Sequence, residues 1–133
     1  RAYQNIYVLL SETGFYGSII DALQQQLAGT NVKITNIDRF AQGQQDFRTT
    51  LSRVKKSKPD ALLAFLVPGV DLQNFLRQTR EQNLNLPLFG GDSVAFDEKI
   101  QKDPSVAEGM IYFDYLRSGG EPFAAKFRAR FKR

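Results

Sequence analysis

The chain lacks histidine, cysteine and tryptophan altogether, and it has one methionine among its 133 residues. Without histidine and cysteine it cannot form a Ser-His-Asp or Cys-His catalytic triad, a zinc site built from those ligands, or a disulfide bond. Carboxylate chemistry or an oxygen-ligand metal site would still be possible, but both need clustered acidic residues. These absences narrow the catalytic chemistry that is open to the chain, and we expect that it is not an enzyme and holds no cofactor and no metal ion.

Long apolar runs are also missing. The longest unbroken one, residues 61–67, is far shorter than the roughly 20 residues that a membrane-spanning helix requires. Hydrophobic residues make up 42% and charged residues 24% of the chain, which is typical of a globular protein. The length is ordinary for one domain and short for two, so we predict a single domain over residues 1–133.

The net charge of +4 is unevenly distributed. Residues 117–133 contain six basic residues and one acidic residue, whereas the rest of the chain is close to neutral. In this last segment Phe123, Phe127 and Phe131 have helical spacing, and basic residues near a helix end complement its dipole. A solvated helix face therefore explains the charge better than a phosphate-binding patch, and we expect no nucleic-acid partner.

Two hydrophobic periods alternate along the chain, which predicts strands separated by helices. The predicted strands are residues 6–10, 32–35, 61–67, 86–89 and 110–113. The predicted helices have their inner faces at Ile19–Leu27, at Phe47–Val54 after an Asp46 cap, at Leu72–Thr79 after an Asp71 cap, at residues 94–102, and after Pro122. Strands connected in this way form a parallel sheet with right-handed crossovers.

Strand composition predicts the order of the sheet. Residues 6–10 and 61–67 are apolar throughout, as in strands covered on both faces, whereas residues 32–35 alternate as in an edge strand. The order 2-1-3-4-5 satisfies this pattern. The predicted fold class is therefore α/β, a three-layer α/β/α sandwich with a five-stranded parallel sheet of the flavodoxin-like type.

In such a sheet, ligands bind beyond the carboxyl ends of the strands, where the strand order reverses. The loops concerned are residues 11–18, 68–71 and 90–93. Asp92 could pair with a ligand ammonium group or could only cap the next helix; Tyr16 could cover an apolar ligand or pack on its own helix. Glu12 is another acid in these loops. Gly14 and Gly17 lack the remaining residues of a dinucleotide or P-loop motif, so they do not indicate a phosphate site.

Several segments together resemble the type I periplasmic binding proteins, in particular the receptors of branched-chain amino-acid ABC transporters. They comprise residues 43–47 with Leu51 and Val54, 58–63, 71–80, 86–92 and 107–110, in the same order and spacing. The resemblance implies a protein of two lobes joined by hinge strands, with the ligand held between them. It implies that this chain is the second lobe of such a protein.

The resemblance also implies roles for particular residues. Asp92 matches the acid that meets the α-ammonium group of the ligand, and Tyr16 matches the aromatic residue of the first loop. Gly14 and Glu12 belong to the same loop, and Pro68 and Gly69 match a loop in which amino-acid receptors often carry an aromatic residue. This chain has none there, which argues against a leucine-like ligand.

The function that follows is binding of an amino acid or similar small polar ligand in the periplasm or outside the cell. The expected partners are the first lobe of the same parent chain and a membrane permease of an ABC transporter. Two alternatives stay open at this point. One is a ligand-sensing domain of a signalling receptor or transcription regulator with the same fold, and the other is a flavodoxin-like nucleotide-binding enzyme.

Overall fold

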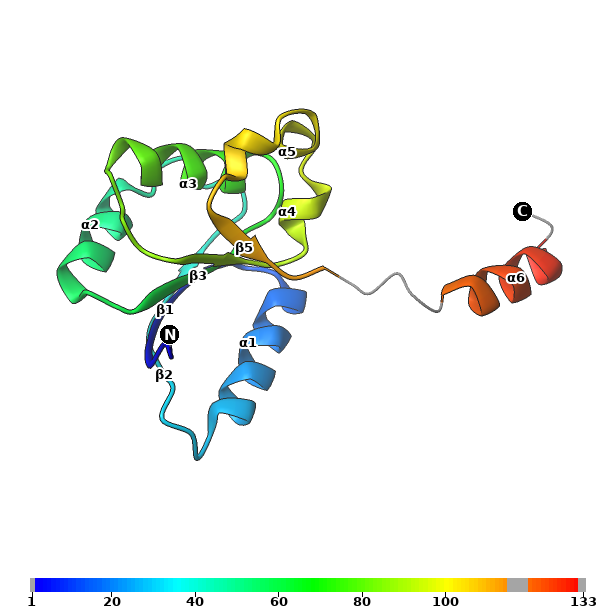
Figure 1. Cartoon of the computed structure of the whole chain (residues 1–133), viewed down its shortest axis with the longest axis horizontal. Coiled ribbons are helices and arrows are strands. Elements are labelled where there is room, and N and C mark those ends of the chain that lie inside the picture. The colour runs from blue at the N-terminus through cyan, green and yellow to red at the C-terminus, as the bar shows by residue number, and fades with distance from the viewer. Residues whose placement is uncertain (1, 115–119, 132–133) are drawn as a thin grey trace.

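The computed structural model of the chain describes residues 2–114 and 120–131 (Figure 1). In these ranges the sheet has five strands, β1 (Asn5–Ser11), β2 (Lys33–Phe40), β3 (Ala61–Phe65), β4 (Leu88–Gly90) and β5 (Met110–Tyr112). Every neighbouring pair is parallel, and the order is β2-β1-β3-β4-β5. This confirms the predicted sheet, with the apolar strands β1 and β3 in its interior.

The helices of the described ranges are α1 (Gly14–Leu27), α2 (Arg48–Ser57), α3 (Val70–Glu81), α4 (Ser93–Phe96), α5 (Glu98–Lys102) and α6 (Gly120–Phe131), with a short 3₁₀ helix, η1 (Pro104–Ala107). α1 lies below the sheet in Figure 1, and α2 to α5 lie above it. Right-handed crossovers dictate this division, because only the connection from β1 to β2 runs in its direction across the sheet. The three predicted layers are therefore present.

Each face of the sheet carries its own apolar core. On the face of α2 to α5, Phe47 and Phe75 are fully buried and meet edge to face at 5.8 Å between ring centroids. On the face of α1, Ile20 packs against Val8, Leu10 and other buried residues of β1 and β3. Burial of large apolar side chains supplies most of the driving force for folding.

Strand β2 extends five residues beyond its predicted end, and a bulge explains why the sequence pattern missed it. The register on β1 steps from Ile34 to Asn36, so Thr35 has no partner there. An extra residue in a strand turns the following side chains to the other face. As a result Ile34 and Ile37, three positions apart, both pack against the core of α1, and simple alternation breaks down.

Three predicted helix boundaries were wrong. α2 begins at Arg48 with Phe47 at its N-cap, although the carboxylate of Asp46 does accept a hydrogen bond from the Arg48 N–H at 3.0 Å. α3 begins at Val70, so Asp71 lies inside its first turn and is not its cap. The single helix predicted over residues 94–102 is divided into α4 and α5 at residue 97.

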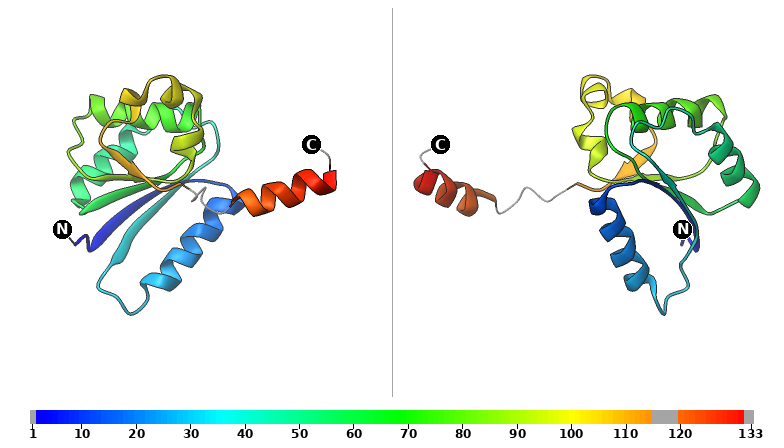
Figure 2. Two further views of the ribbon diagram at one scale, coloured as in Figure 1. Left: turned by 45° about the vertical axis from the view of Figure 1, so that its right-hand side comes forward. Right: turned by 180° about the vertical axis from the view of Figure 1, so that it is seen from behind.

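The face covered by α1 is only partly filled. A groove of about 350 Å³ lies on this face beside α1, between Leu23 and Leu27 on one side and Phe89 and Ile111 on the other. In Figure 1 and in the right-hand view of Figure 2, α6 extends away from the sheet and does not lie over this face. Among the described residues, no helix combines the length and apolar character that crossing a membrane requires.

Candidate ligand-binding site at the carboxyl edge of the sheet

The carboxyl ends of the strands meet at one edge of the sheet, and the strand order reverses there between β1 and β3. The loop after β1, the loop after β3 and the turn after β4 all begin at this edge. These are the three loops in which the sequence placed its candidate residues. The structure therefore brings the candidates to the part of the fold where open α/β sheets bind ligands.

A buried hydrogen-bond network forms the floor between β1 and β3. The Ser11 hydroxyl donates to Asp71 Oδ2 at 3.0 Å and accepts from the Val67 N–H at 3.1 Å. The other carboxylate oxygen of Asp71 accepts from the Gly43 N–H at 2.8 Å. Ser11 and Asp71 are 0% and 1% exposed, so this carboxylate is part of the scaffold that fixes three loops.

A second buried acid, Asp97, fixes the loop after β3. Its carboxylate accepts from the N–H groups of Gly69, Lys99 and Ile100 at 2.7 to 3.1 Å. The side-chain amide of Gln73 donates to both carboxylate oxygens at 3.1 Å. Burial alone would raise the pKa of Asp97, but these hydrogen bonds outweigh it and hold the pKa below its ordinary value.

Asp92 differs from both of these acids. It is half-buried in the turn after β4 and occupies the N-cap position of α4, yet its carboxylate accepts no capping hydrogen bond. Within the described residues no hydrogen bond or ion pair to this carboxylate is present. The adjacent Ser93 hydroxyl is buried and also has no partner in that part of the chain. The capping role considered for Asp92 is therefore not what its side chain does here.

A row of aromatic rings runs along the same edge. Phe15 contacts Tyr16, Tyr16 contacts Phe65, and Phe65 contacts Phe113, with centroid distances of 5.6, 5.8 and 5.8 Å. The two inner rings are buried, at 5% and 2% exposed, whereas Phe15 and Phe113 at the two ends are 52% and 48% exposed. The row thus has a buried middle and two open ends.

Gly91, the residue before Asp92, lies beside one end of this row. A Cβ atom on Gly91 would lie 2.9 Å from the Phe65 ring and 3.6 Å from the Phe113 ring. Only glycine leaves room for the Phe65 ring at this point, since 2.9 Å is closer than real Cβ contacts, whereas 3.6 Å to Phe113 is an ordinary contact distance. The Phe113 N–H also donates to the Gly90 carbonyl at 3.4 Å. Phe113 therefore lies beside Gly90 and Gly91, at the start of the turn after β4.

The other predicted site residues are placed less favourably for binding. Tyr16 is buried, and its hydroxyl donates to the Leu66 carbonyl at 3.4 Å, so it supports the loop after β3. Gly69 has φ +92°, which favours glycine, and its N–H is used by Asp97. Glu12, Gly14 and Pro68 are exposed at the edge, and they remain candidates only by their position.

The segments that contain these three loops carry acidic residues and no basic ones. Residues 11–18, 66–71 and 90–97 contain four acids and no lysine or arginine. Two of the acids are Asp71 and Asp97, whose oxygens are occupied as described above. Glu12 and Asp92 therefore leave these segments negatively charged, because none of the three segments contains a basic residue.

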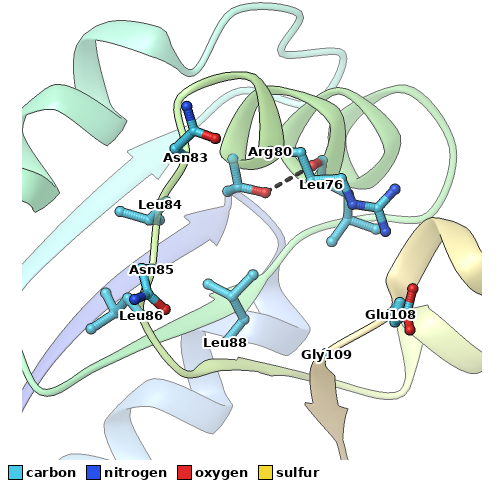
Figure 3. A pocket seen from close by; sticks show the side chains of 10 residues that line it. Leu76, Arg80, Asn83, Leu84, Asn85, Leu86, Leu88, Glu108 and Gly109 are labelled. Carbon is cyan, nitrogen blue, oxygen red and sulfur yellow. Dashed lines mark hydrogen bonds between the residues drawn. The ribbon is translucent and has the colours of Figure 1, made fainter.

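Another concave part of the surface lies away from this edge. A hollow of about 570 Å³ is lined by Leu84, Leu86 and Leu88 before and in β4, and by Arg80 and Glu108, at the amino ends of β4 and β5 (Figure 3). The Arg80 guanidinium there donates to backbone carbonyls of η1, so it serves the fold. No group of acids able to hold a metal ion is found in the described part of the chain.

Tyr7 is the other group with a shifted pKa. Burial, with a hydrogen bond of 2.7 Å to Asp38, raises the pKa of Tyr7 to about 12. Asp38 in turn accepts from the Arg53 guanidinium at 3.0 Å. Tyr7 therefore stays protonated at neutral pH and links β1, β2 and α2.

A family model described as periplasmic binding protein matches residues 1–133, the whole of the chain. The chain belongs to the periplasmic binding protein family. This confirms the family resemblance that the sequence segments indicated, and the fold agrees with it.

Solved periplasmic binding proteins share this fold. A branched-chain amino-acid ABC transporter ligand-binding protein from Burkholderia xenovorans is 22% identical, with a TM-score of 0.70 over 98% of this chain and 36% of that one. A solute-binding protein from Rhodopseudomonas palustris, in complex with 3,4-dihydroxybenzoic acid, is 19% identical (TM-score 0.71; 98% and 38%). A branched-chain amino-acid transporter protein from Streptococcus pneumoniae, in complex with isoleucine, is 17% identical (TM-score 0.62; 96% and 38%).

The chain therefore spans less than two fifths of each of these three binding proteins. Their bound ligands differ chemically, since one is an aromatic acid and another is an aliphatic amino acid. Similarity of fold cannot choose between such ligands. The residues at the carboxyl edge have to supply that argument.

Sequence reasoning missed three elements of this edge: the exposed ring of Phe113, and the scaffold roles of Ser11 and Asp97. Phe113 is the last apolar residue of a predicted strand, and nothing in the pattern distinguishes it from a core residue. In the sequence pattern, Ser11 is only the first residue of a loop. Asp97 could have been found as a helix cap, because it stands three residues before the apolar Ile100.

Proposed function

We propose that this chain is one ligand-binding lobe of a two-lobed receptor that works outside the cytoplasmic membrane for an ABC transporter. The ligand is a small molecule with an amino group, such as an amino acid. It would bind between this lobe and the first lobe of the same parent protein, and hinge closure would present the closed form to a membrane permease. The role is binding and not catalysis.

The observation that carries this proposal is the carboxylate of Asp92. It is half-buried, it lies at the ligand-binding edge of the sheet, and no hydrogen bond of the described residues occupies it. An ammonium group provides the hydrogen-bond donors and the positive charge that such a carboxylate lacks. The absence of lysine and arginine from residues 11–18, 66–71 and 90–97 favours a ligand that is positively charged where it meets these segments.

The same charge argument bears on ligands that are only anionic. Benzoate-type acids carry a negative charge and no donor for Asp92. This lobe offers them no cation in the three loops, so the first lobe would have to supply all of their charge compensation. An amino acid has both charges, and its carboxylate can be left to the first lobe.

Calorimetry on the complete protein that contains this chain tests the proposal. The panel should contain the common L-amino acids, their amides, small acids without an amine, such as benzoate, and ATP as a nucleotide. We expect binding of at least one amine-bearing compound and much weaker binding of the acids. Tightest binding of an acid without an amine would refute the amine ligand, and nucleotide binding instead would refute the receptor role.

A further inference from the structure

The two faces of the sheet are covered unequally. α2 to α5 lie over one face, whereas α1 is the only helix over the other in the part of the chain that the structure describes (Figure 1). Neighbouring strands are about 4.8 Å apart and packed helices about 8–10 Å apart, so five strands leave room for two helices side by side. The core under α1 is built from β1, β2 and β3. The same face of β4 and β5 is therefore free for a second helix.

The groove of about 350 Å³ lies over this uncovered part of the sheet. Leu23 and Leu27 of α1 line one side of it, and Phe89 and Ile111 line the other. The apolar residues 111–113, at the end of β5, are between 46% and 58% exposed. An apolar surface of this kind marks a place where another element packs.

α6 carries an apolar surface of its own. Phe127 and Phe131 lie one turn apart, are 43% and 53% exposed, and have ring centroids 4.7 Å from each other. Of the eight large hydrophobic residues that are exposed in the described ranges, five belong to the groove or to α6. A helix of 12 residues is also marginal in water on its own. α6 therefore needs a surface to pack on, and the groove needs a helix.

The connection between β5 and α6 favours α6 of the same chain over that of a second copy. β5 ends at Tyr112 and α6 begins at Gly120, so the seven residues 113–119 connect them and can span at most about 25 Å. Because β5 itself lines the groove, α6 is held close to it, at an effective concentration of the order of millimolar. At about 18 Å, α6 is also nearly as long as α1, which measures about 21 Å.

We propose that α6 folds back onto its own sheet and covers this groove, with Phe127 and Phe131 packed between α1 and residues 111–113. α6 then lies beside α1 as the second helix of that layer. The charges of the two helices agree with this, since α1 has the single acid Asp21 and no base, whereas α6 has three bases and one acid. The packing requires no ligand, so it stands independently of the proposed function.

Tryptophan fluorescence can follow α6 directly, because the chain has no tryptophan of its own. In the 133-residue chain, Phe127→Trp places an indole on the face that meets the groove. Ala129→Trp is the matched control, since residue 129 is exposed and lies about 200° away around the same helix. We expect emission at shorter wavelength and weaker quenching by acrylamide for Phe127→Trp than for Ala129→Trp. Sedimentation at the same concentrations should show a monomer.

A charge placed in the groove should release α6. Ile111→Glu leaves the carboxylate in water when α6 is away but buries it when α6 is packed. The α6 amides of the wild type should therefore exchange hydrogen at least about 10-fold more slowly than those of Ile111→Glu, a factor that burial of one large apolar side chain can supply. Phe96→Glu is the control, because Phe96 is similarly exposed but belongs to α4 on the other face. It should leave the exchange of α6 unchanged.

Three results would overturn the proposal. The first is equal emission from the two tryptophan variants, or wild-type α6 amides that exchange as fast as those of Ile111→Glu. The second is burial of the indole that appears only as a dimer forms with rising concentration, because the occupant would then be a second copy. The third is release of α6 by Phe96→Glu as readily as by Ile111→Glu. Urea unfolding checks that each variant is folded, and the exchange of the wild type needs no substitution.

Discussion

Two groups of acids lie at the carboxyl edge of the sheet, and they differ in one respect. We call Asp71 and Asp97 the buried layer and Glu12 and Asp92 the open layer. In the buried layer, Asp71 and Asp97 have hydrogen bonds to both carboxylate oxygens, from loops far apart in the sequence. In the open layer, Glu12 is exposed and Asp92 is half-buried with no hydrogen bond from the described residues. All four acids follow strands or begin helices, so their sequence positions look alike.

Hydrogen bonds from the protein to the carboxylate distinguish an acid that belongs to the scaffold from one that is available to a ligand. A carboxylate whose oxygens are satisfied by the protein can hold a ligand only by giving up those bonds. One that is partly desolvated without a partner gains from a ligand that brings donors and positive charge. We therefore expect substitutions in the buried layer to change stability, and substitutions in the open layer to change binding.

The largest effect on stability is expected at Phe65, the ring at the centre of the buried layer. It is 2% exposed and contacts both Tyr16 and Phe113. Phe65→Ala should lower the free energy of unfolding by roughly 3–5 kcal/mol, through lost burial and the cavity left behind. Urea midpoints of the wild type and the variant measure this, and a loss below about 1 kcal/mol would remove Phe65 from the core.

Replacing Asp97 should lower the free energy of unfolding somewhat less than replacing Phe65. Asp97→Ala leaves the N–H groups of Gly69, Lys99 and Ile100 without their acceptor, and we expect a loss of about 3 kcal/mol in the free energy of unfolding. Asp103→Ala is a matched control. Asp103 caps η1, but it is exposed, so its loss should cost about 1 kcal/mol. Equal losses for the two variants would show that the buried network adds nothing to a simple cap.

The pH dependence of stability provides a test that leaves the packing intact. The pKa of Asp97 is below its ordinary value of 3.8, so its ionised form is favoured by folding. That contribution is present above the unfolded pKa and is lost as the pH falls through the folded pKa. The stability difference between the wild type and Asp97→Asn, followed by urea unfolding, should therefore shrink from pH 7 to pH 3. A difference that grows on acidification would contradict the sign of the shift.

The smallest effect on stability is expected in the open layer. Asp92→Asn keeps the size of the side chain and removes a charge that no described residue compensates. We expect the free energy of unfolding to change by no more than about 0.5 kcal/mol. A loss of 2 kcal/mol or more in urea unfolding would place Asp92 in the scaffold and remove the contrast between the two layers.

The sequence alone predicted the strand order and the layers, because the two interior strands are apolar throughout and the crossovers have a fixed hand. It failed where a local rule was overridden by a particular contact. The bulge at Thr35 broke the alternation of β2, and the capping bonds of Asp97 ended α4 at the residue where the pattern continued. Neither the bulge nor the capping bonds can be located from the hydrophobic pattern alone.

At the candidate site, the pattern of loops predicted that the three loops meet at one edge of the sheet, as they do, and it named Asp92 for its position. It could not tell Asp92 from Asp71, because whether a carboxylate is occupied depends on partners such as Ser11 and Gly43, 60 and 28 residues away. The exposure of Phe113 was equally out of reach, since it depends on what covers the end of β5. Long-range partners, and not residue type, separate the two layers.

The most direct test of this account is the affinity of the Asp92→Asn variant of the complete protein for whichever amine-bearing ligand the wild type binds. Removing one partner of a desolvated charge pair typically costs about 2–5 kcal/mol of binding, and calorimetry should show an affinity at least about 30-fold weaker. The urea midpoint should be unchanged. If the variant binds that ligand as tightly as the wild type does, Asp92 is not the ammonium partner and the open layer does not have the role assigned to it.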